Sequence, residues 1–493
     1  MKIKKLLLGA LFASAATLSM SAADAKYIFY FIGDGMGMGP VMTAQNYNRV
    51  ILKNDKPLLM MQFPTVSWCQ TYSASSLITD SAAAGTALST GTKTRNSMLG
   101  MAPDTTDVTS IARIFKDSGY GVGVVTSVAP DDATPGAFYA HVPNRGMYYE
   151  IGKQAASSGY DFIAGAGLRG RKDKEGKATD LMDVMAQNNV QVVYGRDGVK
   201  EISSDKVMLL NTDGQHDWDI HYAIDSLAEN LTLPIITEAC LNQLLKNSPD
   251  KFFMMVEGGL IDHALHGNDG GAAIIETLNF DESLKIAYDF YLAHPDETLI
   301  VVTADHDTGG LALGNNRTPH LEYFKYQRVS KEAFNEYCKS LARNRMVYRW
   351  EDMREYLREN FGFFDHVPVG EKEEARLKER LDEARELFSS DSPGKEALGA
   401  NIVELEQALF DVRADLESLS ETMARMEREQ GFSLPVMPAA TAAADNGKTM
   451  LVDNDYFRDN LSAADYKQLL AAQKKESEVA ELIGKLQENY DQM

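Results

Sequence analysis

The chain has 493 residues and a formal net charge of −22, because 71 acidic side chains outnumber 49 basic ones. This balance argues against a nucleic-acid-binding protein, which needs a basic face to neutralise phosphates. With 44% apolar residues, the chain can bury a large core and is not intrinsically disordered. The length permits one elaborated α/β domain or up to about three smaller domains.

The N-terminus has the pattern of a secretory signal peptide. Three lysines precede an apolar run from Leu6 to Leu18, and mostly small residues follow as far as Ala25. A membrane anchor needs about 18 or more apolar residues, and this run is shorter. We therefore predict that residues 1–23 are removed, that the product is periplasmic or secreted, and that the mature chain has no membrane span.

Within the predicted catalytic domain, residues 24–369, short β-rich runs alternate with helical patterns from Lys26 to about Gly314. The best strand candidates are Lys26–Ile32, Gly121–Thr126, Asn189–Tyr194, Lys206–Leu210, Phe252–Val256 and Thr298–Thr303. Several are apolar on both faces, which is typical of a mostly parallel sheet covered by helices on both faces. We predict one α/β catalytic domain of this kind, which binds ligands beyond the carboxyl ends of its strands.

Residues 370–493 have a different pattern. Large apolar residues recur at alternating spacings of four and three from Leu398 to Met426, which is the seam of a coiled coil. We predict a helical hairpin or small bundle attached to the catalytic domain. The alternative is a coiled coil that binds a partner or forms a homodimer, because heptads do not distinguish intramolecular from intermolecular pairing.

Oxygen and nitrogen ligands follow four of the predicted strands. They are Asp34, Asp132, Thr134, Glu257, Asp262, His266, Asp305 and His306. Asp262 and His266 are four residues apart, a spacing that lets two side chains on one helix face bind one ion. Oxygen-rich sets suit magnesium and mixed Asp/His sets suit zinc, so the sequence predicts a multi-metal site.

Ser81 is the candidate nucleophile. It precedes an Ala-rich run that is expected to form a helix, so the alternative reading is that Ser81 caps that helix. Both roles are compatible, because the free amides of a helix N-terminus favour a phosphate dianion. The chain has no G-x-S-x-G elbow that would indicate acyl transfer.

Taken together, these stretches resemble the alkaline phosphatase family, and specifically its secreted bacterial type. The matching segments stand in the family's order and cover most of residues 26–314: IGDGMG (32–37), TDSAAAGTALSTG (79–91), DATPGAFYAHVPNR (132–145), EGGLIDHALH (257–266) and TADHDTG (303–309). The resemblance implies hydrolysis of small phosphate monoesters with two zinc ions and one magnesium ion.

The resemblance also implies a role for each matching residue. Ser81 becomes phosphorylated and Arg145 clamps the phosphate. One zinc site is formed by Asp34, Asp305 and His306, and the other by Asp262 and His266. Magnesium is surrounded by Asp34, Asp132, Thr134 and Glu257. Zinc chemistry fits these roles, because a zinc ion lowers the pKa of a bound hydroxyl and a second ion about 4 Å away stabilises the leaving oxygen.

Two features depart from the family pattern. His263 occupies a position that is lysine in some members and histidine or tryptophan in others, which makes it a candidate residue beside the phosphate. The family also supplies a third histidine to the second zinc from a short H-[TS]-x stretch late in the chain. After His306 only His320 and His366 remain, and neither has that context. We therefore expect an incomplete second zinc site, in a truncated chain or a true variant, unless His320 folds back to complete it.

Three hypotheses follow for the function. The first is a metal-dependent phosphomonoesterase of broad specificity. The second is an impaired or truncated family member that binds metal and phosphate with little turnover. The third is a phosphodiesterase or sulfatase relative. The three cysteines, Cys69, Cys240 and Cys338, are too few and too far apart for a disulfide framework, and we expect buried unpaired thiols.

Overall fold

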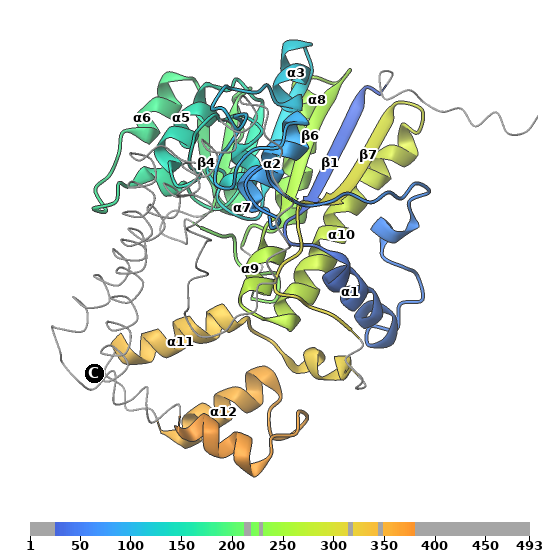
Figure 1. The fold of residues 1–493 in the computed structure, drawn as a ribbon, viewed down its shortest axis with the longest axis vertical. Coiled ribbons are helices and arrows are strands. Elements are labelled where there is room, and N and C mark those ends of the chain that lie inside the picture. The colour runs from blue at the N-terminus through green and yellow to red at the C-terminus, as the bar shows by residue number, and fades with distance from the viewer. Residues whose placement is uncertain (1–24, 212–217, 226–229, 314–318, 344–348, 380–493) are drawn as a thin grey trace, which may run out of the picture. The chain divides into compact units, whose positions relative to one another are not determined.

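A computed structural model describes residues 25–211, 218–225, 230–313, 319–343 and 349–379 (Figure 1). The chain divides into two compact units, Met1–Gly370 and Glu371–Met493. The predicted signal peptide and the predicted coiled coil lie outside the described residues, so both stay predictions. Within the described ranges, no helix is both long and apolar enough to cross a bilayer.

The first unit is built on a seven-stranded sheet whose order is β4-β5-β3-β2-β6-β1-β7. Its strands are β1 (Tyr27–Gly33), β2 (Gly121–Thr126), β3 (Phe162–Ala164), β4 (Gln191–Tyr194), β5 (Val207–Leu210), β6 (Phe252–Gly258) and β7 (Thr298–Ala304). Every neighbouring pair is parallel. The predicted α/β class is therefore confirmed. All six predicted strands form, and β3 was missed because three residues carry no readable periodicity.

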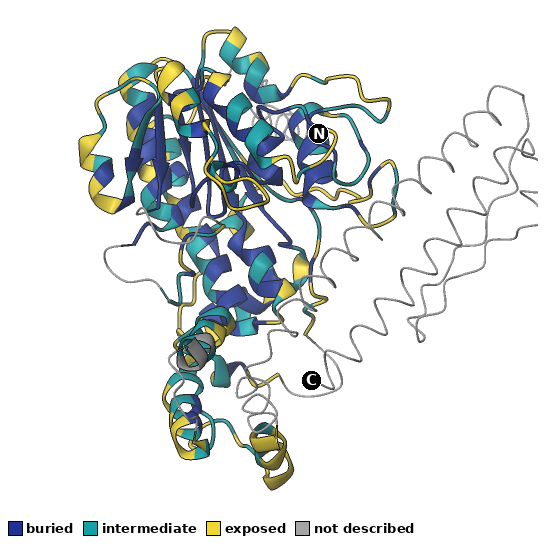
Figure 2. Cartoon of the chain, turned by 90° about the vertical axis from the view of Figure 1, so that its left-hand side faces the viewer, coloured by how far each residue is buried: buried dark blue, intermediate teal, exposed yellow. Residues whose placement is uncertain are grey.

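Helices cover both faces of this sheet, and each face has its own core cluster. The first face packs against α8 (Leu233–Asn247), α9 (Leu260–His266) and α10 (Gly270–Ala293). The second packs against α2 (Ser81–Thr90), α3 (Ile111–Asp117), α4 (Ala133–Gly136), α5 (Tyr148–Ser157) and α6 (Leu181–Gln187). Figure 2 shows the buried residues concentrated in the strands and on the inner sides of these helices. Burial on both faces explains why the strands read as continuous apolar runs.

The remaining helices flank these two layers, and some of their residues, among them Val41, Leu59 and Val199, also pack against the first core cluster. They are α1 (Met38–Val50), α7 (Gly195–Gly198), α11 (Lys331–Arg343) and α12 (Trp350–Phe361), with 3₁₀ turns η2 (Leu59–Gln62), η3 (Arg169–Arg171), η4 (Val199–Glu201) and η5 (Leu321–Tyr326).

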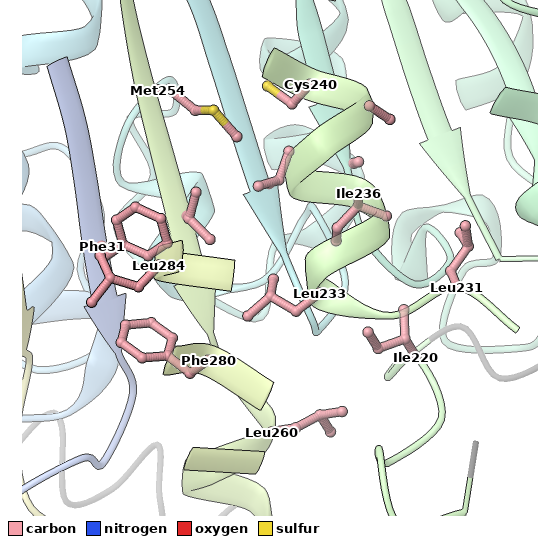
Figure 3. Close-up of a cluster of buried hydrophobic side chains, with 14 of the residues drawn as sticks. Phe31, Ile220, Leu231, Leu233, Ile236, Cys240, Met254, Leu260, Phe280 and Leu284 are labelled. Carbon is pink, nitrogen blue, oxygen red and sulfur yellow. The ribbon is translucent and has the colours of Figure 1, made fainter. Parts of the chain in front are cut away.

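The cluster under α8, α9 and α10 is closely packed. Phe31 of β1 and Phe280 of α10 meet edge-on, with ring centroids 5.7 Å apart (Figure 3). A Cβ at Gly123 of β2 would lie 2.3 Å from the Cys240 sulfur of α8, so only glycine lets this helix approach the strand so closely. Cys240 is buried as predicted, whereas Cys69 is exposed and contradicts the expectation of three buried thiols.

Candidate active site

Four neighbouring strands, β2, β6, β1 and β7, bring the predicted ligands to the edge of the sheet where the strands end. In the register, Gly33 of β1 stands beside Gly258 of β6 and Ala304 of β7. Thr126, the last residue of β2, stands beside Glu257 of β6. Because all four strands are parallel, the loops that follow them leave from the same edge, where an open α/β sheet binds its ligands.

Asp34, Asp305 and His306 form one compact cluster of donors. Their ligand atoms all lie within 4.8 Å of one another, and all three residues are placed where solvent hardly reaches. Nε2 of His306 lies 3.4 Å from Oδ1 of Asp34 and 3.3 Å from Oδ2 of Asp305. The backbone amides of Gly35 and His306 donate to the other oxygen of Asp305 at 3.0 and 2.8 Å, which orients that carboxylate toward the cluster.

Two oxygens of this cluster fit a metal ion. Oδ1 of Asp34 and Oδ2 of Asp305 are buried, and neither has a hydrogen-bond donor among the residues that the structure describes. Burial raises the pKa of Asp34, and the nearby Asp305 raises it further. Burial likewise raises the pKa of Asp305 to about 7. Buried carboxylate oxygens without a donor are costly unless a cation compensates them, so this set of ligand atoms suits zinc.

Ser81 is the first residue of α2, and its hydroxyl reaches this cluster. Its Oγ lies 3.2 Å from Nε2 of His306. The helix is capped by Asp80, whose carboxylate accepts from the amide of Ala83 at 3.0 Å. The reading of Ser81 as the cap is therefore wrong. Because Asp80 takes the capping role, the Ser81 hydroxyl is left to face the cluster at the positive end of the helix.

Asp262 and His266 lie on one face of α9, as their spacing predicted. Oδ2 of Asp262 is 3.4 Å from Nε2 of His266, whose side chain is 71% exposed. The hydroxyl of Thr308 donates to Oδ1 of Asp262 at 2.5 Å and lies 3.2 Å from Nδ1 of His306. Thr308 therefore links the Asp262–His266 pair to the cluster beside Ser81.

His320 is engaged elsewhere. Its Nδ1 lies 2.8 Å from Glu322, and its ring stacks on Tyr323 with the centroids 5.0 Å apart. These contacts give no support to the prediction that His320 folds back and completes the second zinc site.

Thr134 and Glu257 also lie near Asp34. The Thr134 hydroxyl is 3.5 Å from Oδ2 of Asp34, and Thr126 donates to Glu257 at 2.5 Å. Burial raises the pKa of Glu257 well above its ordinary value, with the charge of Asp34 as the next contribution. These buried oxygens suit a hard cation such as magnesium.

Asp132 is bound by two arginines. Arg145 donates through Nη2 to Oδ1 of Asp132 at 3.1 Å, and Arg169 donates through Nη1 to Oδ2 at 3.0 Å. Arg145 also lies 3.5 Å from Oδ2 of Asp80. Burial acts to raise the pKa of Asp132, but the two guanidinium groups hold it below its ordinary value. Both carboxylate oxygens are thus committed to arginines.

His263, which lies on α9, contacts Asp219. Its Nδ1 lies 2.8 Å from Oδ1 of Asp219. Burial acts to lower the pKa of this imidazole, but Asp219 outweighs burial and the pKa rises to about 10. Asp132 and Asp262 add to the rise. His263 therefore brings a positive charge to the region between Asp132 and Asp262.

The sequence profile of the alkaline phosphatase family matches residues 25–376, which include every residue of this site. The chain belongs to the alkaline phosphatase family. This finding agrees with the resemblance that the motifs indicated. The secreted bacterial type and the missing histidine segment stay predictions.

Characterised relatives come from fungi, bacteria and animals. The chain is 30% identical over 354 residues to the repressible alkaline phosphatase of Saccharomyces cerevisiae, covering 65% of this chain and 62% of that protein. It is 30% identical over 321 residues to alkaline phosphatase 4 of Bacillus subtilis, covering 61% and 66%. The match thus spans less than two thirds of each relative's length.

Solved structures of alkaline phosphatases share the fold. The Thermus thermophilus enzyme superposes with a TM-score of 0.63 at 25% identity, covering 75% of this chain and 76% of that one. The enzyme of the Antarctic bacterium TAB5 gives a TM-score of 0.53 at 28% identity, covering 63% and 85%.

Sequence reasoning missed five residues that shape the site. Asp80 and Thr308 stand inside the quoted motifs, so their proximity to Ser81 and His306 was a signal that went unused. Arg169, Trp218 and Asp219 stand outside every motif, and only the folded chain places them near Asp132 and His263.

Proposed function

We propose that this chain hydrolyses phosphate monoesters through a phosphoserine at Ser81. One observation carries the proposal: Ser81 is the first residue of helix α2, and its hydroxyl lies 3.2 Å from Nε2 of His306. The cluster around it contains two buried carboxylate oxygens, one each from Asp34 and Asp305, that find no donor among the described residues. The family membership supports the same chemistry.

The residues of the chain would perform the following steps. Arg145 holds two phosphate oxygens, because its planar guanidinium offers parallel N–H donors that match them. The α2 N-terminus adds free amides to the same dianion. Oγ of Ser81 loses its proton to solvent and attacks phosphorus, the bond from phosphorus to the leaving oxygen breaks, and that oxygen takes up a proton from solvent and departs as the alcohol. Water cleaves the phosphoserine and releases inorganic phosphate, which restores Ser81. Alignment and charge stabilisation are the main demands of this reaction.

The proposed function includes metal ions, because the site contains three sets of side chains that suit them as ligands. Asp34, Asp305 and His306 would hold one zinc, and Asp262 and His266 would hold a second. Asp34, Thr134 and Glu257 would hold magnesium, with Asp132 at the rim of that site because both its oxygens bind arginines. Variants of the TAB5 enzyme bind magnesium in a site named M3, which supports a magnesium requirement. Such ions supply positive charge that lowers the pKa of a bound hydroxyl and stabilises developing negative charge.

A second candidate is an impaired family member with little turnover. The observation that favours it is the Asp262–His266 pair, in which two residues supply the donors and the imidazole is largely exposed. The predicted periplasmic or secreted location and homodimer also stay proposals.

The test compares esters and serine variants in the full chain supplied with zinc and magnesium. We expect hydrolysis of 4-nitrophenyl phosphate, and much slower hydrolysis of bis(4-nitrophenyl) phosphate and 4-nitrophenyl sulfate. Ser81→Ala should lower the rate by about three orders of magnitude or more and abolish phosphate incorporation. Ser89→Ala is the matched control, because Ser89 lies on the same helix and donates to the Ala137 carbonyl. Undiminished turnover by Ser81→Ala would refute the nucleophile, and faster diester or sulfate cleavage would favour the third hypothesis.

A further inference from the structure

Arg169 is a nearly buried arginine whose guanidinium contacts two aromatic rings. Its guanidinium carbon lies 3.6 Å from the ring centroid of Tyr148 and 3.4 Å from that of Trp218. The side chain is only 9% exposed. Aromatic rings that stack on the faces of a guanidinium leave the N–H groups at its edge able to donate hydrogen bonds. The stacking and the hydrogen bonds together fix the orientation of the Arg169 side chain.

The backbone of Arg169 is also fixed by hydrogen bonds. The carboxylate of Asp131 accepts from the amide of Arg169 at 3.1 Å and from that of Gly170 at 2.8 Å. A Cβ at Gly170 would lie 2.7 Å from backbone atoms of Tyr149, so the turn η3 packs against this backbone more closely than another residue would permit. Two consecutive residues, Asp131 and Asp132, therefore bind the backbone and the side chain of Arg169.

Asp132 connects Arg169 to the phosphate clamp. Arg169 binds one carboxylate oxygen and Arg145 binds the other, at 3.0 and 3.1 Å. The two arginines differ in exposure, because the Arg145 side chain is 32% exposed against 9% for Arg169. The more exposed arginine is the one that a phosphate can reach, and the buried one holds Oδ2 of the carboxylate between them, whose Oδ1 also accepts from the Ala133 amide at 2.7 Å.

We propose that Arg169 is a positioning residue, which aims Arg145 at the phosphate through the carboxylate of Asp132. The inference rests on the proposed function for the identity of the ligand. Trp218 and Tyr148 contribute by holding Arg169 in place. Without Arg169, Oδ2 of Asp132 loses its donor, while Oδ1 still accepts from the Ala133 amide and from Arg145. The carboxylate is then held at one oxygen only, so Arg145 loses part of its fixed direction and binds phosphate less tightly.

The experiment measures the affinity of the full chain for inorganic phosphate by calorimetry, with zinc and magnesium present. Arg169→Met should weaken phosphate binding by about tenfold, a coupling typical of residues in one ion-pair network. In an Arg145→Lys background the same change should have little further effect, because the clamp is already lost. Trp218→Leu keeps the guanidinium and removes one ring, and we expect a smaller loss of the same kind. Arg354→Met is the matched control, because Arg354 stacks on Phe364 at 4.1 Å on α12.

Three results would overturn the inference. The first is unchanged phosphate affinity in Arg169→Met. The second is an equal loss in both backgrounds, which would mean that Arg169 contacts phosphate independently. The third is a loss of thermal stability alone. If Arg169→Met does not fold, the same cycle between Trp218→Leu and Arg145→Lys decides the question. Phosphate binding without ester turnover would contradict the proposed function and leave this inference standing.

Discussion

Replacing Arg145 by lysine tests the phosphate clamp directly. The two terminal nitrogens of Arg145 already reach two carboxylates, Asp132 at 3.1 Å and Asp80 at 3.5 Å. Because its two terminal nitrogens contact two different carboxylates, the orientation of the guanidinium group is fixed. Lysine carries one compact ammonium, which cannot bind both carboxylates and present two parallel donors to a phosphate.

The expected loss follows from the number of hydrogen bonds. A hydrogen bond to a charged group contributes roughly 1.5–3 kcal/mol. If lysine keeps one of two bonds to phosphate, affinity falls by roughly tenfold to a hundredfold, at 1.4 kcal/mol for each factor of ten. We therefore expect Arg145→Lys to raise both the KM for a phosphate ester and the inhibition constant of inorganic phosphate by that factor.

The assay is competitive inhibition by inorganic phosphate during hydrolysis of 4-nitrophenyl phosphate. Arg113→Lys is the matched control, since Arg113 donates to Asp117 through Nε and Nη2 on the exposed side of α3. The control should leave the inhibition constant unchanged. Equal inhibition constants for Arg145→Lys and the unaltered chain would show that Arg145 does not bind the phosphate.

Two further predictions concern metal content and pH. After dialysis, metal analysis should find about one tightly held zinc per chain, because the Asp262–His266 pair supplies fewer ligands than a typical zinc site. Two tightly held zinc ions would show that a third ligand completes the second site. Glu276 on α10 is buried beside the amide of Ala223, and burial raises its pKa to about 8. An unfolded glutamate titrates near pH 4.3, so the folded state binds the extra proton between these values and stability falls as pH rises from about 4.3 to about 8. Glu276→Gln should reduce the drop in Tm between pH 5.5 and 8.5, and an unchanged drop would contradict this assignment.

Much of the site was predictable because its residues follow strands. Parallel strands with apolar faces are readable from local sequence, and their carboxyl ends necessarily meet at one edge. Asp34, Glu257 and Asp305 were therefore expected near one another before the fold was known. The register confirms that β1, β6 and β7 end side by side.

The contacts of individual side chains were less accessible. The role of Asp80 as the helix cap, rather than Ser81, depends on which of two adjacent residues turns back to the Ala83 amide. Thr308 was overlooked because a threonine in a loop carries no periodic signal. Its link between Asp262 and His306 exists only when β7 and α9 lie together.

By itself, the sequence determined the class of fold, the strands that carry the ligands, and the family to which the chain belongs. These properties depend on local patterns, since strand periodicity and short motifs involve residues close together in the chain. The tertiary structure alone decided that Arg169 reaches the carboxylate of Asp132, that Trp218 stacks on Arg169 and that Asp219 binds His263. Arg169 lies in η3, Trp218 and Asp219 lie in a later loop, and His263 lies on α9, so no local spacing in the sequence relates them and only the packing of these segments on the sheet brings them into contact.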